Sequence, residues 1–522
     1  MPIAGWPTTD RDPQGRSQMA RLREFLRRQI VPFHPYYRDL FSREKVDIDS
    51  LRTLSDLTRL PFSEKKMVAP SRENPDQPRS FVLQPTAETL RGSLSLGGRM
   101  AFLWKAMVNG KEAVREEIGK EYRPVQVFFT TGRTSLPTSF FLSRYDLNIL
   151  ERVGARIAAL VQVDPAKDKL LSLFPYAPHL AFWQVQTMGV ASGTFTLQTG
   201  GGKVMGTDGI IQTIGKMKPT FLCGIPGYVY HVVREAVEEG VDLSSVSTVF
   251  LGGDRMVGGY RDKLKELLSR GGSQNPRVLS VLGFTEARKC WSECPGGEAT
   301  GFHTYPDLEI FEIVDPDSGK QLPEGSTGEL VYTPLDGRGS IVLRYRTGDI
   351  VSGGITHEPC PACGLTVPRF SSDLSRRSNV TDFSLTKIKG TLVNLNLLAD
   401  ILNGHPAVDE WQLVVRKRND DPFDVDEMEL AVALGSGREE NEIVPELCRR
   451  VREALEVRLS NTEVLSRAEL LERLGMETRL KENRIVDLRP KGAASPSSGS
   501  AKPSEPPSEP ESAEPSASVQ ES

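Results

Sequence analysis

The sequence of 522 residues contains no long uninterrupted hydrophobic run and few cysteines. A membrane-spanning helix would need an apolar run of about 20 residues, so we expect no membrane partner. The first residues carry charges where a signal peptide has its apolar core, which predicts a cytoplasmic protein. The 6 cysteines are too few for a disulfide scaffold in a chain of this length, so thiols or metal ligands are their expected roles.

An excess of charge of one sign is lacking as well, because the formal net charge is only -4 at pH 7. Proteins that bind nucleic acids normally carry a basic surface, so this composition argues against that class. What the chain does contain is 38% hydrophobic and 26% charged residues, as a globular protein does. Its length predicts two or three domains.

Apolar runs of strand length alternate with helical stretches from about residue 125 to residue 283. This alternation predicts mainly parallel strands, because parallel pairing requires a crossover helix. One such helix is expected after Pro137, and a later strand is expected over 340–348. Ligands in these sheets bind beyond the carboxyl ends of the strands.

The predicted fold class is therefore α/β, with a large N-terminal domain of mixed sheets and helices and a small α+β C-terminal domain. An amphipathic helix is expected over 17–31. The tail is rich in Pro, Ser, Glu and Ala and is expected to be disordered. The predicted divisions are a helical and irregular lead-in (1–95), the core of the large domain (96–376), the small mobile domain (377–490) and the tail (491–522).

Three short motifs have groups suited to a nucleotide. The stretch FFTTGRTSLPTSFF, 128–141, places hydroxyls and turn N–H groups after a strand, where they can cradle phosphate. In GFTE, 283–286, a glutamate at a strand end can bind Mg²⁺. RYRTGD, 344–349, ends on an aspartate able to accept both ribose hydroxyls. Each motif alone is also compatible with an ordinary turn or helix start.

Together, the order and spacing of these motifs resemble the adenylate-forming acyl-activating superfamily, and most closely its phenylacetate-CoA ligase-like branch. The resemblance extends over about 17–489. Further matching segments are LSDLTRLPFSEKKMV, MKPTFLCGIPGYVYHV, VFLGGDRM, EIVDPDSG, GELVYT, CPACGLTVPRF and RLKENRIVDLR.

The resemblance implies an acid–thiol ligase that forms AMP. A carboxylate attacks the α-phosphate of ATP to give an acyl-adenylate, and a thiol, usually that of coenzyme A, then displaces AMP. Thr285 would contact the α-phosphate, Glu286 would hold Mg²⁺, and Lys481 on the small domain would stabilise developing charge. The implied nucleotide-binding residues are Thr130, Thr131, Gly132, Thr134, Gly252, Gly253, Asp254, Gly283 and Asp349.

The phosphate loop departs from the family pattern at two positions. Arg133 stands at a hydroxyl position and Ser135 at a glycine position, and losing that glycine restricts the backbone φ angle. Two alternatives to coenzyme A ligation therefore stay open. One is delivery of the acyl group to a carrier protein or an amine, and the other is a nucleotide-binding homologue with impaired catalysis.

A possible metal site lies between the second and third motifs. Cys360 and Cys363 form a C-x-x-C pair, which with Cys294 and His303 makes a Cys₃His set typical of structural zinc. Cys290 is a possible substitute ligand. The alternative is a set of reduced thiols without metal.

The resemblance also implies which residues form the wall of the acyl site. The candidates are Tyr176, His179, Gly227 and Tyr228. Their aromatic rings suit an aryl or arylacetic acid, although aromatic residues of α/β elements also serve as core. A homodimer is a reasonable expectation for such a protein.

Overall fold

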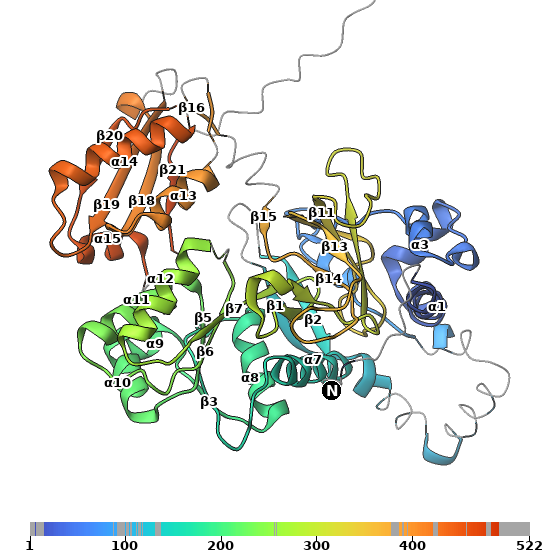
Figure 1. The fold of residues 1–522 in the computed structure, drawn as a ribbon. Helices are drawn as coiled ribbons and strands as arrows, with labels where there is room; N and C mark the ends of the chain where they lie inside the picture. Colours follow the sequence, from blue (N-terminus) through green and yellow to red (C-terminus); the bar gives the residue numbers. More distant parts are fainter. Residues whose placement is uncertain are drawn as a thin grey trace, which may run out of the picture.

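The structure is a computed structural model, shown in Figure 1. No helix in the part of the chain that it describes is long and apolar enough to cross a membrane. The described residues are 6, 15–86, 88–90, 100, 104, 107–110, 112, 116, 118–130, 137–254, 256, 258–376, 386–388, 391–393, 395–420, 426–455, 457–476 and 482–489.

The N-terminal part is helical, as its periodicity predicts. Met19, Leu22 and Phe25 recur at helical spacing and are all buried, which holds the first helix on the protein. The elements are α1 (Arg16–Phe25), a π-helical turn η1 (Leu26–Ile30), α2 (Val31–Phe33), α3 (Pro35–Arg43), η2 (Ile48–Ser50), η3 (Leu54–Arg59), α4 (Lys65–Val68) and η4 (Gln77–Phe81).

A six-stranded sheet in the order β4-β3-β5-β6-β7-β8 forms the centre of the large domain. The first five of these strands are parallel and β8 is antiparallel to β7. The strands are β3 (Lys169–Ser172), β4 (Phe195–Gln198), β5 (Phe221–Gly224), β6 (Thr248–Gly252), β7 (Arg277–Phe284) and β8 (Lys289–Ser292). The helices between and beside them are α7 (Arg144–Leu160), α8 (Leu180–Ser192), α9 (Gly202–Met205), α10 (Thr207–Met217), α11 (Pro226–Glu238) and α12 (Gly258–Arg270).

The helix expected after Pro137 is α7, but an unexpected strand precedes it. Residues Ser139–Ser143 form β2, antiparallel to β1 (Pro124–Phe129). Phe140 and Leu142 are buried in alternation, as in a strand with one face inward. Helix α7 begins only after Ser143, whose backbone N–H donates to the Asp146 carboxylate in a capping box.

A β-rich part follows the central sheet, as expected. Its four-stranded antiparallel sheet has the order β10-β11-β12-β15, and a smaller sheet has the order β13-β14-β9. The strands are β9 (Phe302–His303), β10 (Glu309–Val314), β11 (Gly328–Pro334), β12 (Tyr345–Val351), β13 (Ile355–Thr356), β14 (Arg369–Phe370) and β15 (Leu374–Arg376), with one turn of 3-10 helix, η5 (Gly297–Thr300).

The strand expected over 340–348 is shorter, because β12 begins at Tyr345. The apolar residues before it bond to the N-terminal part instead of to β11. The Ile341 N–H donates to the Phe81 carbonyl at 2.8 Å, and the Leu343 N–H donates to the Tyr37 hydroxyl at 2.6 Å. An apolar run thus marks burial here, but not strand pairing.

The C-terminal part is a small α+β unit, which confirms the predicted fold class. Its four-stranded sheet has the order β20-β19-β18-β21. The elements are β16 (Thr386–Ile388), β17 (Thr391–Val393), α13 (Leu395–Gly404), β18 (Val408–Lys417), η7 (Arg418–Asp420), β19 (Asp426–Leu434), α14 (Glu440–Leu455), β20 (Asn461–Val464), α15 (Arg467–Leu474) and β21 (Ile485–Asp487). The division of the chain at residue 377 stays a prediction, and the tail lies outside the described residues.

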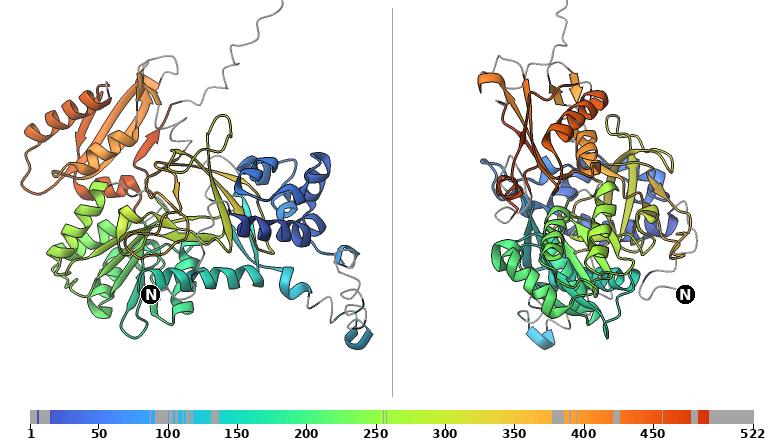
Figure 2. Two further views of the ribbon diagram at one scale, coloured as in Figure 1. Left: turned by 45° about the vertical axis from the view of Figure 1, so that its right-hand side comes forward. Right: turned by 60° about the vertical axis from the view of Figure 1, so that its left-hand side comes forward.

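The small unit lies over α11 and α12 in both views of Figure 2. The contacts across this boundary are polar. Lys263 donates to the carbonyls of His405 and Val408, at 3.0 and 3.1 Å, and Arg467 forms ion pairs with Glu235 and Glu238. Among the described residues, each apolar cluster has members on only one side of this boundary, which we call the charged interface.

Candidate active site

The ends of β6 and β7 bring two predicted motifs together. Gly252 ends β6, and a Cβ atom there would lie 2.9 Å from the Val281 carbonyl oxygen of β7, so only glycine allows this approach. Gly253 follows with φ 85°, and Asp254 is exposed beside it. Gly283 lies near the end of β7. These carboxyl ends are where parallel α/β sheets bind ligands.

Glu286 lies in the turn between β7 and β8, just after the half-buried Thr285. The Tyr345 hydroxyl donates a hydrogen bond to Glu286 Oε1 at 2.9 Å. Tyr345 is the first residue of β12, the strand that also carries Asp349. The sequence motif contains Tyr345, but nothing local to it indicates a bond to a residue 59 positions earlier.

Asp349 is buried, with 5% of its surface exposed, and lies in β12 opposite Arg376 of β15. Its backbone N–H donates to the Thr347 hydroxyl at 3.0 Å, and that hydroxyl donates to the Leu330 carbonyl at 2.9 Å. These bonds fix the backbone on the N-terminal side of Asp349. One strand therefore positions both the predicted ribose ligand and the tyrosine that holds Glu286.

The base of the predicted phosphate loop is closed by a backbone bond. The Thr130 N–H donates to the Thr138 carbonyl at 3.0 Å. Both threonine hydroxyls are buried and have no hydrogen-bond partner among the described residues. Thr138 was not predicted from the sequence. Thr131, Gly132 and Thr134, like Lys481 in the small domain, lie outside the described residues.

The four predicted residues of the acyl wall lie in different surroundings. Tyr176 is 65% exposed, and the His179 ring contacts the Phe129 carbonyl at 3.0 Å through Nδ1. The Tyr228 hydroxyl lies 3.3 Å from that of Thr207. Gly227 lies against Glu482 of the small unit, whose carboxylate would clash with any Cβ atom at this position.

A cavity of about 70 Å³ lies beside the ends of β6 and β7, and none of those four residues lines it. Its walls come from α7, α8 and the strand ends. They consist of Ile157, Phe174, Leu180, Ala181, Gln184, Val185, Met188, Cys223, Phe250, Gly252, Gly253, Val281, Gly283 and Cys290. Burial raises the pKa of Cys223 and of Cys290 to about 12, so both thiols are neutral. Helix α8 is apolar on most sides, so its sequence does not indicate which side faces the cavity.

Cys294, His303, Cys360 and Cys363 converge, with their ligand atoms all within 4.8 Å of one another. The Cys294 and Cys360 sulfurs are 3.8 Å apart, and Cys363 Sγ lies 3.3 Å from His303 Nε2. Hydrogen bonds from the Cys294 and Cys363 thiols lower the pKa of Cys360. Cys290 lies outside this group.

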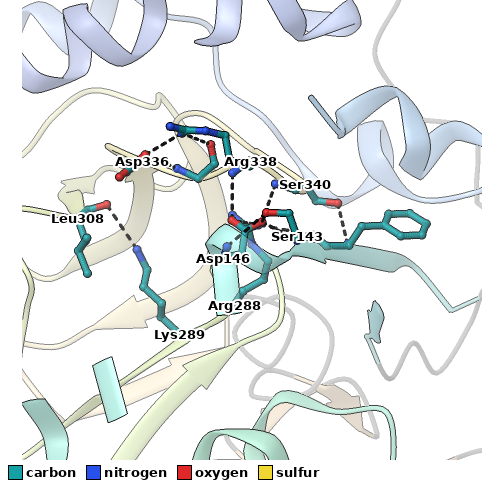
Figure 3. A network of polar contacts seen from close by, with 11 residues as sticks. Ser143, Asp146, Arg288, Lys289, Leu308, Asp336, Arg338 and Ser340 are labelled. Carbon is teal, nitrogen blue, oxygen red and sulfur yellow. Dashed lines mark hydrogen bonds and ion pairs between the residues drawn. The ribbon is translucent and has the colours of Figure 1, made fainter. Parts of the chain in front are cut away.

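A buried polar network joins the turn after β7 to the rest of the large domain (Figure 3). The Asp146 carboxylate accepts hydrogen bonds from the N–H groups of Ser143, Arg338 and Gly339, at 2.8, 3.1 and 2.7 Å. Arg288, two residues after Glu286, pairs with the same carboxylate at 2.9 Å. One side chain thereby connects three segments around the site.

Replacing Asp146 by asparagine is expected to destabilise the protein by about 2 kcal/mol. The amide nitrogen takes the place of one carboxylate oxygen and cannot accept the hydrogen bonds that this oxygen accepts in the unchanged protein. The fall in the thermal unfolding midpoint measures this effect. Asp336→Asn is the control, since Asp336 is only half-buried. Equal midpoints for the two variants would contradict the central role of Asp146.

The fold and these sites define a nucleotide-dependent enzyme that handles its ligands at the carboxyl edge of a parallel sheet. The chain belongs to the AMP-binding enzyme family, whose model matches residues 48–334. It is 25% identical to phenylacetate-coenzyme A ligase of Thermus thermophilus over 425 residues, which are 80% of this chain and 82% of that protein. It is 24% identical to the Aromatoleum evansii phenylacetate-coenzyme A ligase over 60% of this chain and 61% of that protein.

Solved structures share the whole architecture. A crystal structure of 2-hydroxyisobutyryl-CoA ligase in the postadenylation state has a TM-score of 0.71 at 19% identity, over 94% of both chains. The same ligase in the thioesterification state has a TM-score of 0.57, over 93% of this chain and 94% of that one. At such identity the likeness is one of fold.

Proposed function

We propose that the protein is an AMP-forming acid–thiol ligase. A carboxylate oxygen bonds to the α-phosphorus of ATP while the bond to the pyrophosphate breaks. The sulfur of coenzyme A then bonds to the acyl carbon, and AMP leaves. The observation that carries this proposal is the link between Glu286 and Asp349 through β12, together with an apolar cavity whose lining includes Gly253 and Gly283 at the ends of β6 and β7.

The roles of the described residues follow from their positions. Glu286 offers hard carboxylate oxygens suited to Mg²⁺, which would neutralise charge on the phosphates, and Thr285 lies next to it. Asp349 would accept the ribose hydroxyls, and the segment Gly252–Asp254 would border the adenine. The hydroxyls of Thr130 and Thr138, which have no partner among the described residues, would face the phosphates.

The four-residue Cys and His group fits a structural zinc ion. Tetrahedral zinc with Zn–S bonds of about 2.3 Å places its sulfur ligands about 3.7 Å apart, and the Cys294–Cys360 separation is 3.8 Å. Three thiols and an imidazole would complete its coordination and leave no position for a reacting molecule. Such an ion would stabilise the loop between β8 and β14 and take no part in the reaction.

The test is acid-dependent exchange of labelled pyrophosphate into ATP across a panel of carboxylic acids, followed by detection of acyl-coenzyme A. Exchange with thioester formation is the expected result. Exchange followed by transfer only to a carrier protein or an amine would mean that the acyl acceptor is not coenzyme A. Nucleotide binding without exchange for any acid would contradict the proposal.

Replacing Lys481 by alanine is expected to slow adenylate formation about 100-fold, because a positioned cation at the α-phosphate is lost. Glu482, the next residue, contacts Gly227 at the start of α11, which supports this assignment. Burial raises the pKa of the Glu482 carboxyl group, and Arg484 at 2.8 Å opposes that rise.

The control for Lys481→Ala is the second half-reaction, started from synthetic acyl-adenylate and coenzyme A. Its rate is expected to stay within about threefold of the unchanged enzyme, because a residue that acts on the α-phosphate serves the first step. An unchanged rate of pyrophosphate exchange in the variant would remove the proposed role.

A further inference from the structure

The cavity beside the predicted nucleotide site has one amide in its lining. Gln184 of α8 has 4% of its surface exposed, and both its Oε1 and Nε2 atoms have no hydrogen-bond partner among the described residues. The other described lining residues are aliphatic, aromatic, glycine or neutral cysteine. An amide buried in this way destabilises a protein, whereas an apolar side chain of the same shape would not.

The position of Gln184 along α8 indicates how deep its amide lies. Leu180, four residues earlier, borders the strand end, since a Cβ atom on Gly283 would lie 3.5 Å from Leu180 Cδ2. Met188, four residues later, packs on Gly154 of α7. Four residues of helix advance by about 6 Å, so Gln184 lines the middle of the wall, several bonds inward from the strand ends.

The volume of the cavity limits the group that it can hold. Its 70 Å³ is about half of the roughly 150 Å³ of an apolar cavity that binds benzene. A compact acyl chain fits this space better than a large ring system does.

We infer that the acid activated by this enzyme is compact and carries a hydrogen-bonding group, such as a hydroxyl, several bonds from its carboxylate, and that Gln184 recognises this group. The inference rests on the proposed function, because it assigns the acyl group to this cavity, whose lining includes Gly252, Gly253 and Gly283 of the predicted nucleotide site. The amide can both donate and accept, so a hydroxyl can satisfy it in either direction. The parent acid without this group would leave the buried amide unpaired, and the enzyme would discriminate against it.

The experiment compares matched compact acids in pyrophosphate exchange: butanoate with 3-hydroxybutanoate and 4-hydroxybutanoate. We expect kcat/KM for at least one hydroxylated acid to exceed that of its parent by about 10-fold or more. In Gln184→Met this ratio is expected to fall by about 10-fold, because the thioether keeps the shape and lacks the donor. Val190→Ala, at an exposed position of the same helix outside the cavity lining, is the matched control and is expected to keep the ratio.

A second measurement needs no turnover. Gln184→Met is expected to raise the thermal unfolding midpoint of the ligand-free protein by about 2–4 °C, because it removes a buried amide without a partner. A lower midpoint would show that Gln184 supports the fold, and would overturn the inference. If the unchanged enzyme and Gln184→Met both catalyse exchange with the same ratio of kcat/KM for the hydroxylated acid over its parent, the inference would be overturned and the proposed function would stand. Absence of exchange with every acid of the panel used to test the proposed function would overturn both the inference and the proposed function.

Discussion

Replacing Glu286 by glutamine is expected to slow adenylate formation by about 100- to 1,000-fold, the largest catalytic effect of any single substitution proposed for this chain. The amide keeps the shape of the side chain and its bond to the Tyr345 hydroxyl at 2.9 Å. It removes the negative charge that would hold Mg²⁺ against the phosphates. Acid-dependent pyrophosphate exchange at several Mg²⁺ concentrations measures the effect.

The matched control is Tyr345→Phe, which removes only the hydrogen bond that orients Glu286. A loss of positioning without loss of charge is expected to cost no more than about 10-fold. High Mg²⁺ concentration is expected to recover part of the activity of Glu286→Gln, because the weakened site can still be filled. Full activity of Glu286→Gln at low Mg²⁺ would exclude Glu286 as the metal ligand.

The double substitution Cys360→Ser/Cys363→Ser is expected to abolish zinc binding and to destabilise the large domain by about 3 kcal/mol or more. Two thiolates are lost from a set of four, and buried Cys294 and His303 are left without the ion that would join them. Elemental analysis of the unchanged protein is expected to find one zinc ion per chain. The thermal unfolding midpoint measures the loss of stability.

Two other cysteines provide controls for this experiment. Cys448→Ser makes the same chemical change in α14 of the small unit. Cys290→Ser tests the substitute ligand suggested by the sequence, and its zinc content is expected to stay at one per chain, since Cys290 lies in the cavity wall. If elemental analysis found no zinc in protein purified without a chelator, the proposed metal site would be refuted.

The sequence was most informative where the predicted site residues stand together in one short motif. Glu286 and Asp349 stand in motifs of a few residues, and the Cys360–Cys363 pair has a spacing fixed by its ligand geometry. The order of strands and helices follows from the period of their apolar residues. The fold class and the family could therefore be predicted, and the metal-ligand group could be proposed.

Features that depend on contacts between distant segments could not be predicted. In the sequence, Gln184 is a polar residue of a mainly apolar helix, and only the structure shows that it lines a cavity. Thr138 gains significance only from the loop closure at Thr130. Residues 341–343 have the composition of a strand, yet the N–H groups of Ile341 and Leu343 bond to the N-terminal segment. Local pattern does not specify the partner in any of these cases.

The charged interface has a consequence for solubility during domain movement. Opening it would expose Lys263, Arg467 and the glutamates of α11 to water, which solvates such groups well. Since no apolar cluster of the described residues is divided at this boundary, separation of the two parts would expose no apolar cluster to water. The predicted movement of the small domain would then have a free-energy cost that depends on salt and would not promote aggregation.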